Sequence, residues 1–304
     1  MPSPHLVSLL IPVQSARFFE PALASAVAQT YGNLEIVVGD DSPDGKVAAI
    51  VAQRGSRRVT YVRNPSPLGF HGNFAALFTV ARGDYVKFLN HDDVLHPHCV
   101  ARMVAAFVTL GERVALIASR RQLIDPGGAV VPDTAATRPL SDRDCVFHGP
   151  RFGDEMLKCS INRIGEPTAG LFRRADVDLA SGTLFRVGEH DYTCLADMAL
   201  WLRLLARGGL FYFAHPLSFI RVHSMQFQST PEVGARCIAE RVHLPTDARQ
   251  LGFLAADEDH RNARAHGVSL VDAALARPGL DPVARRFLEA ARLSSTTPPP
   301  EAPS

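Results

Sequence analysis

The chain has 304 residues, 46% of them hydrophobic, and a formal net charge of +1 at pH 7. This length is enough for one large or two small domains with a sizeable core. The near-zero net charge gives no reason to expect a nucleic acid or an acidic membrane surface as a partner. No apolar run approaches the roughly 20 residues that cross a bilayer, so we expect no transmembrane segment.

The cysteines and the N-terminal apolar run indicate a cytoplasmic protein. The five cysteines show no paired metal-ligand spacing, so we expect buried thiols and neither a disulfide framework nor a zinc site. They are Cys99, Cys145, Cys159, Cys194 and Cys237. The run 6–13 is short and lacks a preceding basic segment, which favours a first strand over a signal peptide.

Apolar runs alternate with helical patterns over the first 120 residues. Strands are predicted at 7–13, 34–38, 59–62, 85–89 and 114–118, and helices at 19–27, 47–51, 74–81 and 100–108. The strand runs lack polar alternation, as expected of strands buried on both faces. The pattern predicts an α/β fold with a parallel sheet flanked by helices.

Acidic residues follow two of these strands. Asp40, Asp41 and Asp44 lie in a breaker-rich loop after the second strand, and Asp92 and Asp93 follow the fourth. Ligands bind at the carboxyl ends of strands in open α/β sheets. Adjacent carboxylates repel each other unless a cation compensates, and such oxygen ligands suit Mg²⁺ or Mn²⁺. We therefore expect a metal that carries a phosphate, with capped polar turns as the alternative.

Two further loops, 63–72 and 125–153, predict an anion site and an acceptor site, respectively. The loop 63–72 opens a helix near Asn73, and a helix N-terminus can hold an anion. The loop contains neither a phosphate-loop Lys-Ser/Thr motif nor G-x-G-x-x-G, which weakens ATPase and dinucleotide interpretations. The stretch 125–153 is rich in Pro, Gly and charge. We expect it to lie near an acceptor site, since long irregular segments are commonly functional.

The later part of the chain is predicted to be mainly helical. An amphipathic helix at 197–206 would direct Leu200, Trp201 and Leu204 to the core and place Asp197 in its first turn, where the helix dipole favours an acid. Short strands are expected at 211–213 and 218–222. From residue 231 the chain is predicted to be helical, best at 270–276 and 282–293, and the tail 294–304 to be disordered.

Several segments resemble, in order along the chain, the motifs of the family 2 glycosyltransferases, which have the GT-A fold. They are VSLLIPV at 7–13, LEIVVGDDS at 34–42, GDYVKFLNHDDVLHP at 83–97, EPT at 166–168 with FR at 172–173, ADMALWLRL at 196–204 and RVH at 221–223. Any one match is weak, but their common order over about three quarters of the chain is specific. The resemblance implies a GT-A type, Rossmann-like sheet flanked by helices, with a C-terminal helical extension.

The resemblance also implies a donor site. The backbone at Pro12 and Val13, together with Asp40, would hold the nucleotide base, because an aspartate can accept the imide N–H of a uracil or thymine. Asp41 is the alternate for Asp40. Asn73 is counted with the donor-binding residues.

Metal and catalytic roles follow from the same resemblance. Asp92 would contact the ribose or the metal, Asp93 would be the main ligand of Mg²⁺ or Mn²⁺, and His223 would touch the metal or the diphosphate. Asp197 occupies the position of the general base of an inverting transfer. Asn90 and Ala196 stand where the family often has acids. These two departures leave open a non-catalytic sugar-nucleotide-binding protein as an alternative to the enzyme.

The expected protein is thus a metal-dependent inverting glycosyltransferase that uses a nucleotide sugar, with a UDP-sugar favoured. The acceptor is left open among carbohydrate, lipid-linked, natural-product and peptide acceptors, and so is a homo-oligomeric state. A sugar nucleotidyltransferase is a weaker alternative because segment 13–18 has no glycine. The expected place is the cytoplasm, with a peripheral position at the inner face of the membrane also open. Expected domains are 1–230, with a nucleotide-binding half at about 1–120 and an acceptor half at about 121–230, and a helical extension at 231–293.

Overall fold

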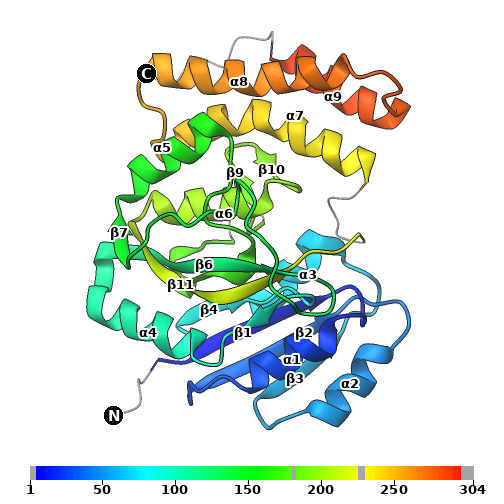
Figure 1. Ribbon diagram of the computed structural model, residues 1–304, viewed down its shortest axis with the longest axis vertical. Coiled ribbons are helices and arrows are strands. Elements are labelled where there is room, and N and C mark those ends of the chain that lie inside the picture. The colour runs from blue at the N-terminus through cyan, green and yellow to red at the C-terminus, as the bar shows by residue number, and fades with distance from the viewer. Residues whose placement is uncertain (1–4, 180–182, 225–229, 296–304) are drawn as a thin grey trace. The chain divides into compact units, whose positions relative to one another are not determined.

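The computed structural model describes residues 5–179, 183–224 and 230–295 (Figure 1). These residues form two compact units, each discontinuous in sequence. The first unit takes the described residues within Met1–Gly149, Arg163–Leu184 and Arg207–His223, and the second those within Pro150–Asn162, Phe185–Ala206 and Ser224–Ser304. The domain boundaries expected from the sequence stay predictions.

The first unit is built on a nine-stranded sheet in the order β3-β2-β1-β4-β8-β6-β11-β5, with β7 paired to β11. Its strands are β1 (Val7–Val13), β2 (Leu34–Asp40), β3 (Val59–Arg63), β4 (Tyr85–Phe88), β5 (Val94–Leu95), β6 (Val114–Ile124), β7 (Cys145–Phe147), β8 (Gly170–Arg173) and β11 (Gly209–Arg221). The strands β3, β2, β1 and β4 are parallel, as predicted. The predicted α/β sheet flanked by helices is therefore confirmed, and β8, which the sequence did not predict, enters antiparallel between β4 and β6.

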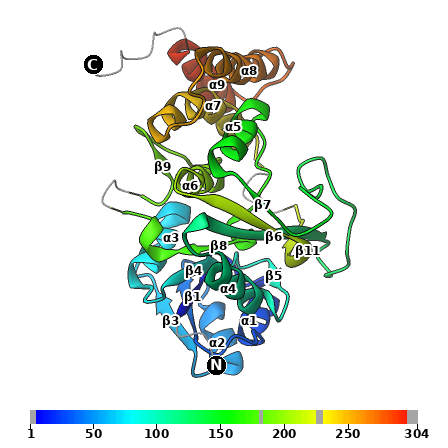
Figure 2. The ribbon, with the colours of Figure 1, turned by 90° about the vertical axis from the view of Figure 1, so that its left-hand side faces the viewer.

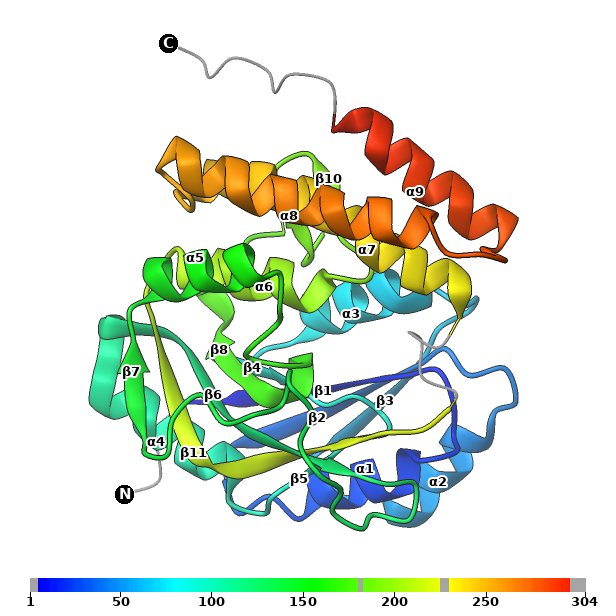
Figure 3. The ribbon, with the colours of Figure 1, turned by 45° about the horizontal axis from the view of Figure 1, so that its top comes forward.

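Helices cover both faces of the parallel part of the sheet (Figure 3). On one face, Leu9 and Ile11 of β1 share a core with Phe19 of α1 (Phe19–Val27) and Phe107 of α4 (Cys99–Leu110). The same face receives α2 (Lys46–Arg54). On the other face, α3 (Gly69–Val80) packs against β1 and β2. Because every residue of β1 is buried, its continuous apolar run reflects two packed faces.

Two strands of the first unit are longer than their apolar patterns. β6 continues six residues beyond the predicted end at 118, because the polar side chain of Arg121 is itself buried and paired with Glu166 at 2.9 Å. The two short strands expected at 211–213 and 218–222 form one strand, β11, and a register shift lies between Phe213 and Ser218. The polar or Pro-containing stretches thus interrupted the patterns without ending the strands.

The second unit is mainly helical. Its elements are α5 (Gly149–Cys159), α6 (Ala196–Leu205), α7 (Pro231–Ala248), α8 (Asp257–Leu275), α9 (Pro282–Ser294), and the small hairpin of β9 (Arg186–Val187) and β10 (His190–Asp191). The first residue of α5, Gly149, is counted with the first unit. The last three helices lie side by side (Figure 2) and share a core with Val242, Val271 and Leu288. The predicted C-terminal helices are therefore confirmed. Most of the tail predicted to be disordered, 296–304, lies outside the described residues.

The helix predicted at 197–206 is α6. Leu200, Trp201 and Leu204 are fully buried, as predicted, and Asp197 lies in the first turn. No helix in the described ranges is both long and apolar enough to cross a membrane.

The cysteine prediction was wrong in two respects. Cys194 and Cys237 form a disulfide with 5.0 Å between their Cα atoms, and Cys145 and Cys159 are only partly buried. Cys99 is a buried thiol, as expected. The two bonded cysteines are separated by 43 residues, so no local spacing marks them as a pair. They meet because α7 lies against the chain that leads into α6.

Candidate functional site

The sheet brings the predicted donor-binding residues of the first unit to one edge. Asp40 ends β2, Val13 ends β1, and Asp92 and Asp93 follow β4, while β1 pairs with both β2 and β4. Because these strands are parallel, their carboxyl ends lie together, as the sequence predicts.

Asp40 is buried and its carboxylate is held on all sides. One oxygen, Oδ1, accepts the backbone N–H of Ser42 at 2.7 Å, and Oδ2 accepts from the Tyr61 hydroxyl and the Arg63 guanidinium, each at 2.7 Å. Burial alone would raise the pKa of Asp40, but these hydrogen bonds together hold it below its usual value. Asp40, at the end of β2, is therefore ionised and fixes the side chains of Tyr61 and Arg63 of β3.

Asp41 and Asn73 belong to an adjacent polar cluster. The carboxylate of Asp41 accepts from Asn64 Nδ2 at 2.6 Å and from the backbone N–H of Leu68 at 3.0 Å. Asn73 donates to the carbonyl of Gly39 at 3.0 Å, and its own oxygen accepts from Asn64 at 3.2 Å. A Cβ at Gly39 would lie 2.5 Å from Asn73 Oδ1, so only glycine fits this close approach. The loop after β3 is thereby tied to the end of β2.

The contacts of Asp40 lead to a stability prediction. Asp40→Asn should lower the melting temperature at pH 7 by roughly 2–8 °C, because the neutral amide has one acceptor oxygen: if that oxygen keeps Tyr61 and Arg63, the amide NH₂ group faces the N–H of Ser42. The pKa of Asp40 is lower in the folded than in the unfolded protein. The ionised carboxylate therefore adds to the free energy of unfolding above the pKa that Asp40 has in the unfolded protein, and this stabilisation is lost as the pH falls through its pKa in the folded protein.

Calorimetric melting of both proteins between pH 7 and pH 3.5 checks this. The difference in melting temperature between wild type and variant should stay constant from pH 7 down to about pH 5 and become smaller below about pH 4. A difference that already changes between pH 7 and pH 5 would contradict the assignment.

Asp92 pairs with His223 at the end of β4. His223 Nε2 lies 3.0 Å from Asp92 Oδ2, and the two side chains are 8% and 16% exposed. The ring of Phe18 stands against the imidazole of His223, with 4.8 Å between ring centroids. Arg221 donates from Nε to the backbone carbonyl of Asp92 at 2.8 Å. This pair brings together two residues that lie 131 positions apart.

Asp93 points into the protein and is only 2% exposed. Its Oδ2 accepts from the hydroxyl of Thr168 at 2.6 Å, and Oδ1 accepts the backbone N–H of Arg221 at 3.0 Å. Burial raises the pKa of Asp93 well above its usual value, and the charge of Asp92 adds to this. Buried Lys87 donates to the carbonyl of Thr168 at 2.7 Å, so these contacts link β4, the turn Pro167–Ala169 and the end of β11.

Asp92 and His223 are candidate ligands of a divalent ion. Asp92 Oδ2 and His223 Nε2 lie within hydrogen-bond distance of each other, at 3.0 Å, and are the kinds of oxygen and nitrogen donor that such ions take. Among the described ranges, no three His, Cys, Asp or Glu side chains converge on one point. Two protein ligands suffice where phosphate oxygens and waters supply the others. Asp93 is 2% exposed and each of its oxygens accepts a protein hydrogen bond, so it is less accessible to an ion than Asp92, and its role as main ligand stays a prediction.

Asp197 lies in the second unit. Its Oδ1 accepts the backbone N–H of Met198 at 2.7 Å, and Oδ2 accepts from Asn162 Nδ2 at 2.7 Å. The structure confirms its place at the start of α6. Its role as a general base stays a prediction.

Sequence reasoning gave no role to three residues that shape this edge of the sheet. Thr168 and Arg221 lie within quoted motifs, but only the fold shows that they hold Asp93 and the backbone of Asp92. Phe18 contacts both His223 and Arg221, the latter at 5.0 Å from the guanidinium carbon to the ring centroid. An aromatic residue beside a helix start carries no signal of such a contact.

The sequence matches a known family and a relative. The family model described as glycosyl transferase family 2 matches residues 8–178. The uncharacterized protein MT1568 of Mycobacterium tuberculosis is 31% identical over 261 residues, which cover 84% of this chain and 77% of that protein.

Two solved structures are similar in fold. Residues 1–349 of S. aureus TarS, in complex with UDP-GlcNAc, match with a TM-score of 0.59 at 14% identity, over 95% of this chain and 89% of that one. In a longer TarS structure the match covers 53% of that chain. The mannosyltransferase PcManGT from Pyrobaculum calidifontis, in complex with GDP-Man and Mn²⁺, matches with a TM-score of 0.54 at 18% identity, over 95% of this chain and 80% of that one.

The ordered motifs, the sheet they build and the family match over more than half of the chain agree, so the chain belongs to glycosyl transferase family 2 and is a glycosyltransferase of the GT-A fold.

Proposed function

We propose that this enzyme transfers a sugar, with inversion, from a nucleoside diphosphate sugar to an acceptor hydroxyl and that it requires Mg²⁺ or Mn²⁺. The observation that carries the proposal is the Asp92–His223 pair at the carboxyl end of β4. These two side chains would be the protein ligands of the metal ion, at the edge of the sheet where β1 and β2 also end.

The nucleotide would lie along the carboxyl ends of β1 and β2. Pro12 and Val13 offer backbone there, although the carbonyl of Val13 accepts the N–H of Asp41 at 2.8 Å. Asp40 fixes Arg63, and this guanidinium is 42% exposed while its partner carboxylate is buried. A UDP-sugar is favoured as donor, which agrees with the UDP-GlcNAc named for TarS. GDP and dTDP sugars are the alternatives, and GDP-Man is named for PcManGT.

The diphosphate end of the donor would be held by Asp92 and His223. A divalent cation bound there supplies a positive charge that stabilises the departing diphosphate. Asp93 would act through its neighbours, since it fixes Thr168 and the backbone of Arg221. Arg221 in turn holds the carbonyl of Asp92 and so orients the loop that carries the ligand.

Asp197 is proposed as the general base. In an inverting transfer, the base takes the proton of the acceptor hydroxyl as that oxygen attacks the anomeric carbon. No covalent intermediate forms. The hydrogen bond from Asn162 and the N–H of Met198 fix both carboxylate oxygens of Asp197 in its own unit. The acceptor is proposed only as a hydroxyl of a carbohydrate, lipid-linked, natural-product or peptide molecule.

A thermal-shift screen tests this function. UDP-, dTDP- and GDP-sugars should be compared with and without Mn²⁺, since a ligand that binds only the native state raises its melting temperature. We expect one nucleotide class to stabilise the protein by about 2.7 kcal/mol at 100 times its dissociation constant, and only with metal. Slow hydrolysis of the same nucleotide sugar with Mn²⁺ should then be detectable. Binding without any hydrolysis would instead support a non-catalytic sugar-nucleotide-binding protein.

A further inference from the structure

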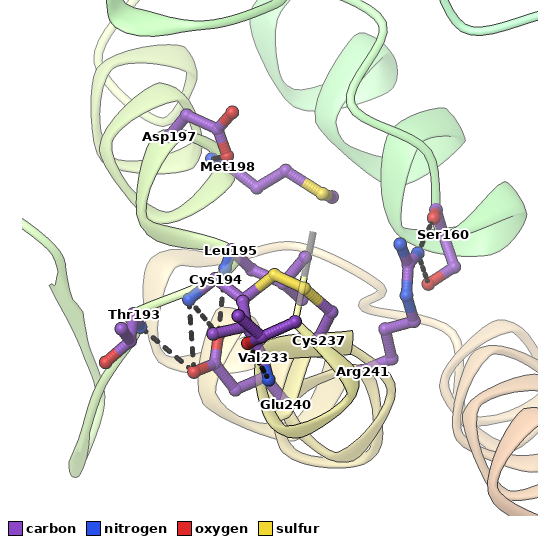
Figure 4. Close-up of a disulfide and its surroundings, with 11 residues drawn as sticks. Ser160, Thr193, Cys194, Leu195, Asp197, Met198, Val233, Cys237, Glu240 and Arg241 are labelled. Atoms are coloured by element: carbon purple, nitrogen blue, oxygen red, sulfur yellow. Dashed lines mark hydrogen bonds between the residues drawn. A yellow bond between two sulfur atoms is a disulfide. The ribbon is translucent and has the colours of Figure 1, made fainter. Parts of the chain in front are cut away.

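The helix α7 holds the chain that leads into α6, and a partly buried acid makes the main contact. The carboxylate of Glu240 accepts the backbone N–H groups of Thr193 and Cys194, each at 3.0 Å, and of Leu195 at 2.8 Å (Figure 4). Leu195 directly precedes α6, and Asp197 lies in the first turn of that helix. Glu240 therefore fixes, from another helix, the three residues that precede α6, the last of which is its N-cap residue Leu195.

A covalent bond ties the same two segments. Cys237 lies three residues before Glu240 on α7, and it is bonded to Cys194, whose N–H Glu240 accepts. Figure 4 shows the disulfide beside the Glu240 carboxylate. Since positions three apart share one face of a helix, the sulfur bridge and the acid act on the same turn from one side.

Asp247 extends this contact further along α7. Its Oδ2 lies 2.7 Å from the hydroxyl of Tyr192, which donates to it, and 2.7 Å from His190 Nδ1. The carboxylate of Asp247 is buried, and burial together with this contact raises the pKa of Tyr192 far above its usual value, so the phenol stays a donor. Residues 190 and 192–195 are thus each held by α7.

Arg241, which follows Glu240 on α7, contacts the segment that carries Asn162, a hydrogen-bond donor to Asp197. Arg241 contacts the backbone carbonyl of Ser160 and donates to its hydroxyl at 2.9 Å. Asn162, two residues later, donates to Asp197 Oδ2 at 2.7 Å. Burial lowers the pKa of Arg241, and the charge of Asp197 opposes this shift, so the two charges interact.

We propose that Glu240 is a positioning residue for Asp197: from α7 it fixes the amino end of α6, and the Cys194–Cys237 bridge keeps it in place. This proposal rests on the proposed role of Asp197 as general base. Without Glu240, three N–H groups would lose their acceptor, two of them in the buried residues Cys194 and Leu195, so the turn would have to move to find another. A displacement of about 1 Å at a reacting group can cost about 10²-fold in rate.

The test compares Glu240→Ala, Glu240→Gln and the double variant Cys194→Ser/Cys237→Ser with the matched control Asp272→Asn. Asp272 is an acid of α8 that pairs with Arg292 at 2.7 Å and does not touch the chain leading into α6. Two quantities are measured on the full chain: backbone hydrogen exchange of residues 193–199, and the kcat and KM of nucleotide-sugar hydrolysis with Mn²⁺. Binding of UDP with Mn²⁺ is the control for an intact first unit.

For Glu240→Ala we expect faster exchange at 193–199 and a kcat lower by about 10- to 100-fold, with KM and UDP affinity within about twofold of wild type. Glu240→Gln retains an acceptor oxygen and should recover part of both losses, which a general loss of folded protein would not produce. The double cysteine variant should show smaller changes of the same kind, and Asp272→Asn none.

The proposal is overturned if exchange at 193–199 rises while kcat is unchanged, or if kcat falls without a change in exchange. Asp197→Asn separates this failure from that of the proposed function. If Asp197→Asn hydrolyses the donor at the wild-type rate, the base assignment is wrong, and the exchange data alone decide whether Glu240 holds the turn. If Asp197→Asn is inactive but Glu240→Ala keeps full kcat, only the positioning role is wrong.

Discussion

Asp197→Asn is expected to lower the rate of glycosyl transfer by about 10²- to 10⁴-fold, the usual contribution of a positioned general base. An asparagine at this position keeps the acceptor oxygen for the N–H of Met198, so the helix start should survive. It cannot take a proton from an acceptor hydroxyl at neutral pH. Donor hydrolysis with Mn²⁺, measured by nucleotide release, gives this rate even before the acceptor is identified.

Two controls make the Asp197 result interpretable. UDP binding with Mn²⁺ should remain within about threefold of wild type, since the proposed donor site belongs to the first unit. Asn162→Ala removes the side chain that donates to Asp197 Oδ2 and should give a milder loss of rate. Transfer by Asp197→Asn at nearly the wild-type rate would mean that another residue is the base.

Asp92→Asn is expected to reduce turnover by at least about 10²-fold, because a neutral amide is a poor substitute for an anionic ligand of Mg²⁺ or Mn²⁺. The backbone carbonyl of Asp92, which Arg221 holds at 2.8 Å, is unaffected by the change, so the loop should keep its conformation. The melting temperature without ligand should change little. The stabilisation by UDP with Mn²⁺ should largely disappear.

Asp93→Asn is the matched comparison for Asp92→Asn. The side chain of Asp93 accepts from Thr168 and from the N–H of Arg221, so an amide there leaves the Thr168 hydroxyl without its acceptor and lowers stability by about 1–3 kcal/mol. The affinity for Mn²⁺ with UDP should fall much less than in Asp92→Asn. The opposite order of affinities would restore Asp93 as the main ligand, as the sequence suggested.

The sequence predicted the parallel strands of the first half of the fold well because most residues of each are apolar or β-branched. The strand Val7–Val13 is buried at every position, and the helix that follows repeats its apolar residues at one-face spacing. β8 was not predicted, since Gly170–Arg173 is a four-residue segment with only two large apolar residues. The sequence predicted two strands in place of β11 because His215 and Pro216 interrupt the apolar run. In the structure the pairing with β6 continues past them after a register shift.

The sequence named candidate residues for the site but could not give their contacts. Asp40, Asp41, Asn73, Asp92, Asp93 and His223 do lie in the same unit as predicted members of a donor site. Which carboxylate is exposed and which is buried depends on partners that the motif does not reveal. Asp92 and Asp93 are neighbours in sequence, yet one pairs with His223 and the other with Thr168.

The disulfide shows a second limit of sequence reading. Cys194 and Cys237 carry no spacing signal, and their pairing follows from α7 lying against the chain before α6. The same is true of Glu240, which reads as an ordinary surface acid of a helix until its three N–H donors are known. Long-range polar contacts of this kind are set by tertiary structure and are not encoded in local patterns.

Anomalous diffraction at the manganese edge, from crystals grown with Mn²⁺ and UDP, tests the central claim most directly. The account predicts one strong peak about 2.0–2.3 Å from both Asp92 Oδ2 and His223 Nε2, in contact with the diphosphate. A peak bound by Asp93 without Asp92 and His223, or UDP bound at another edge of the sheet, would contradict it.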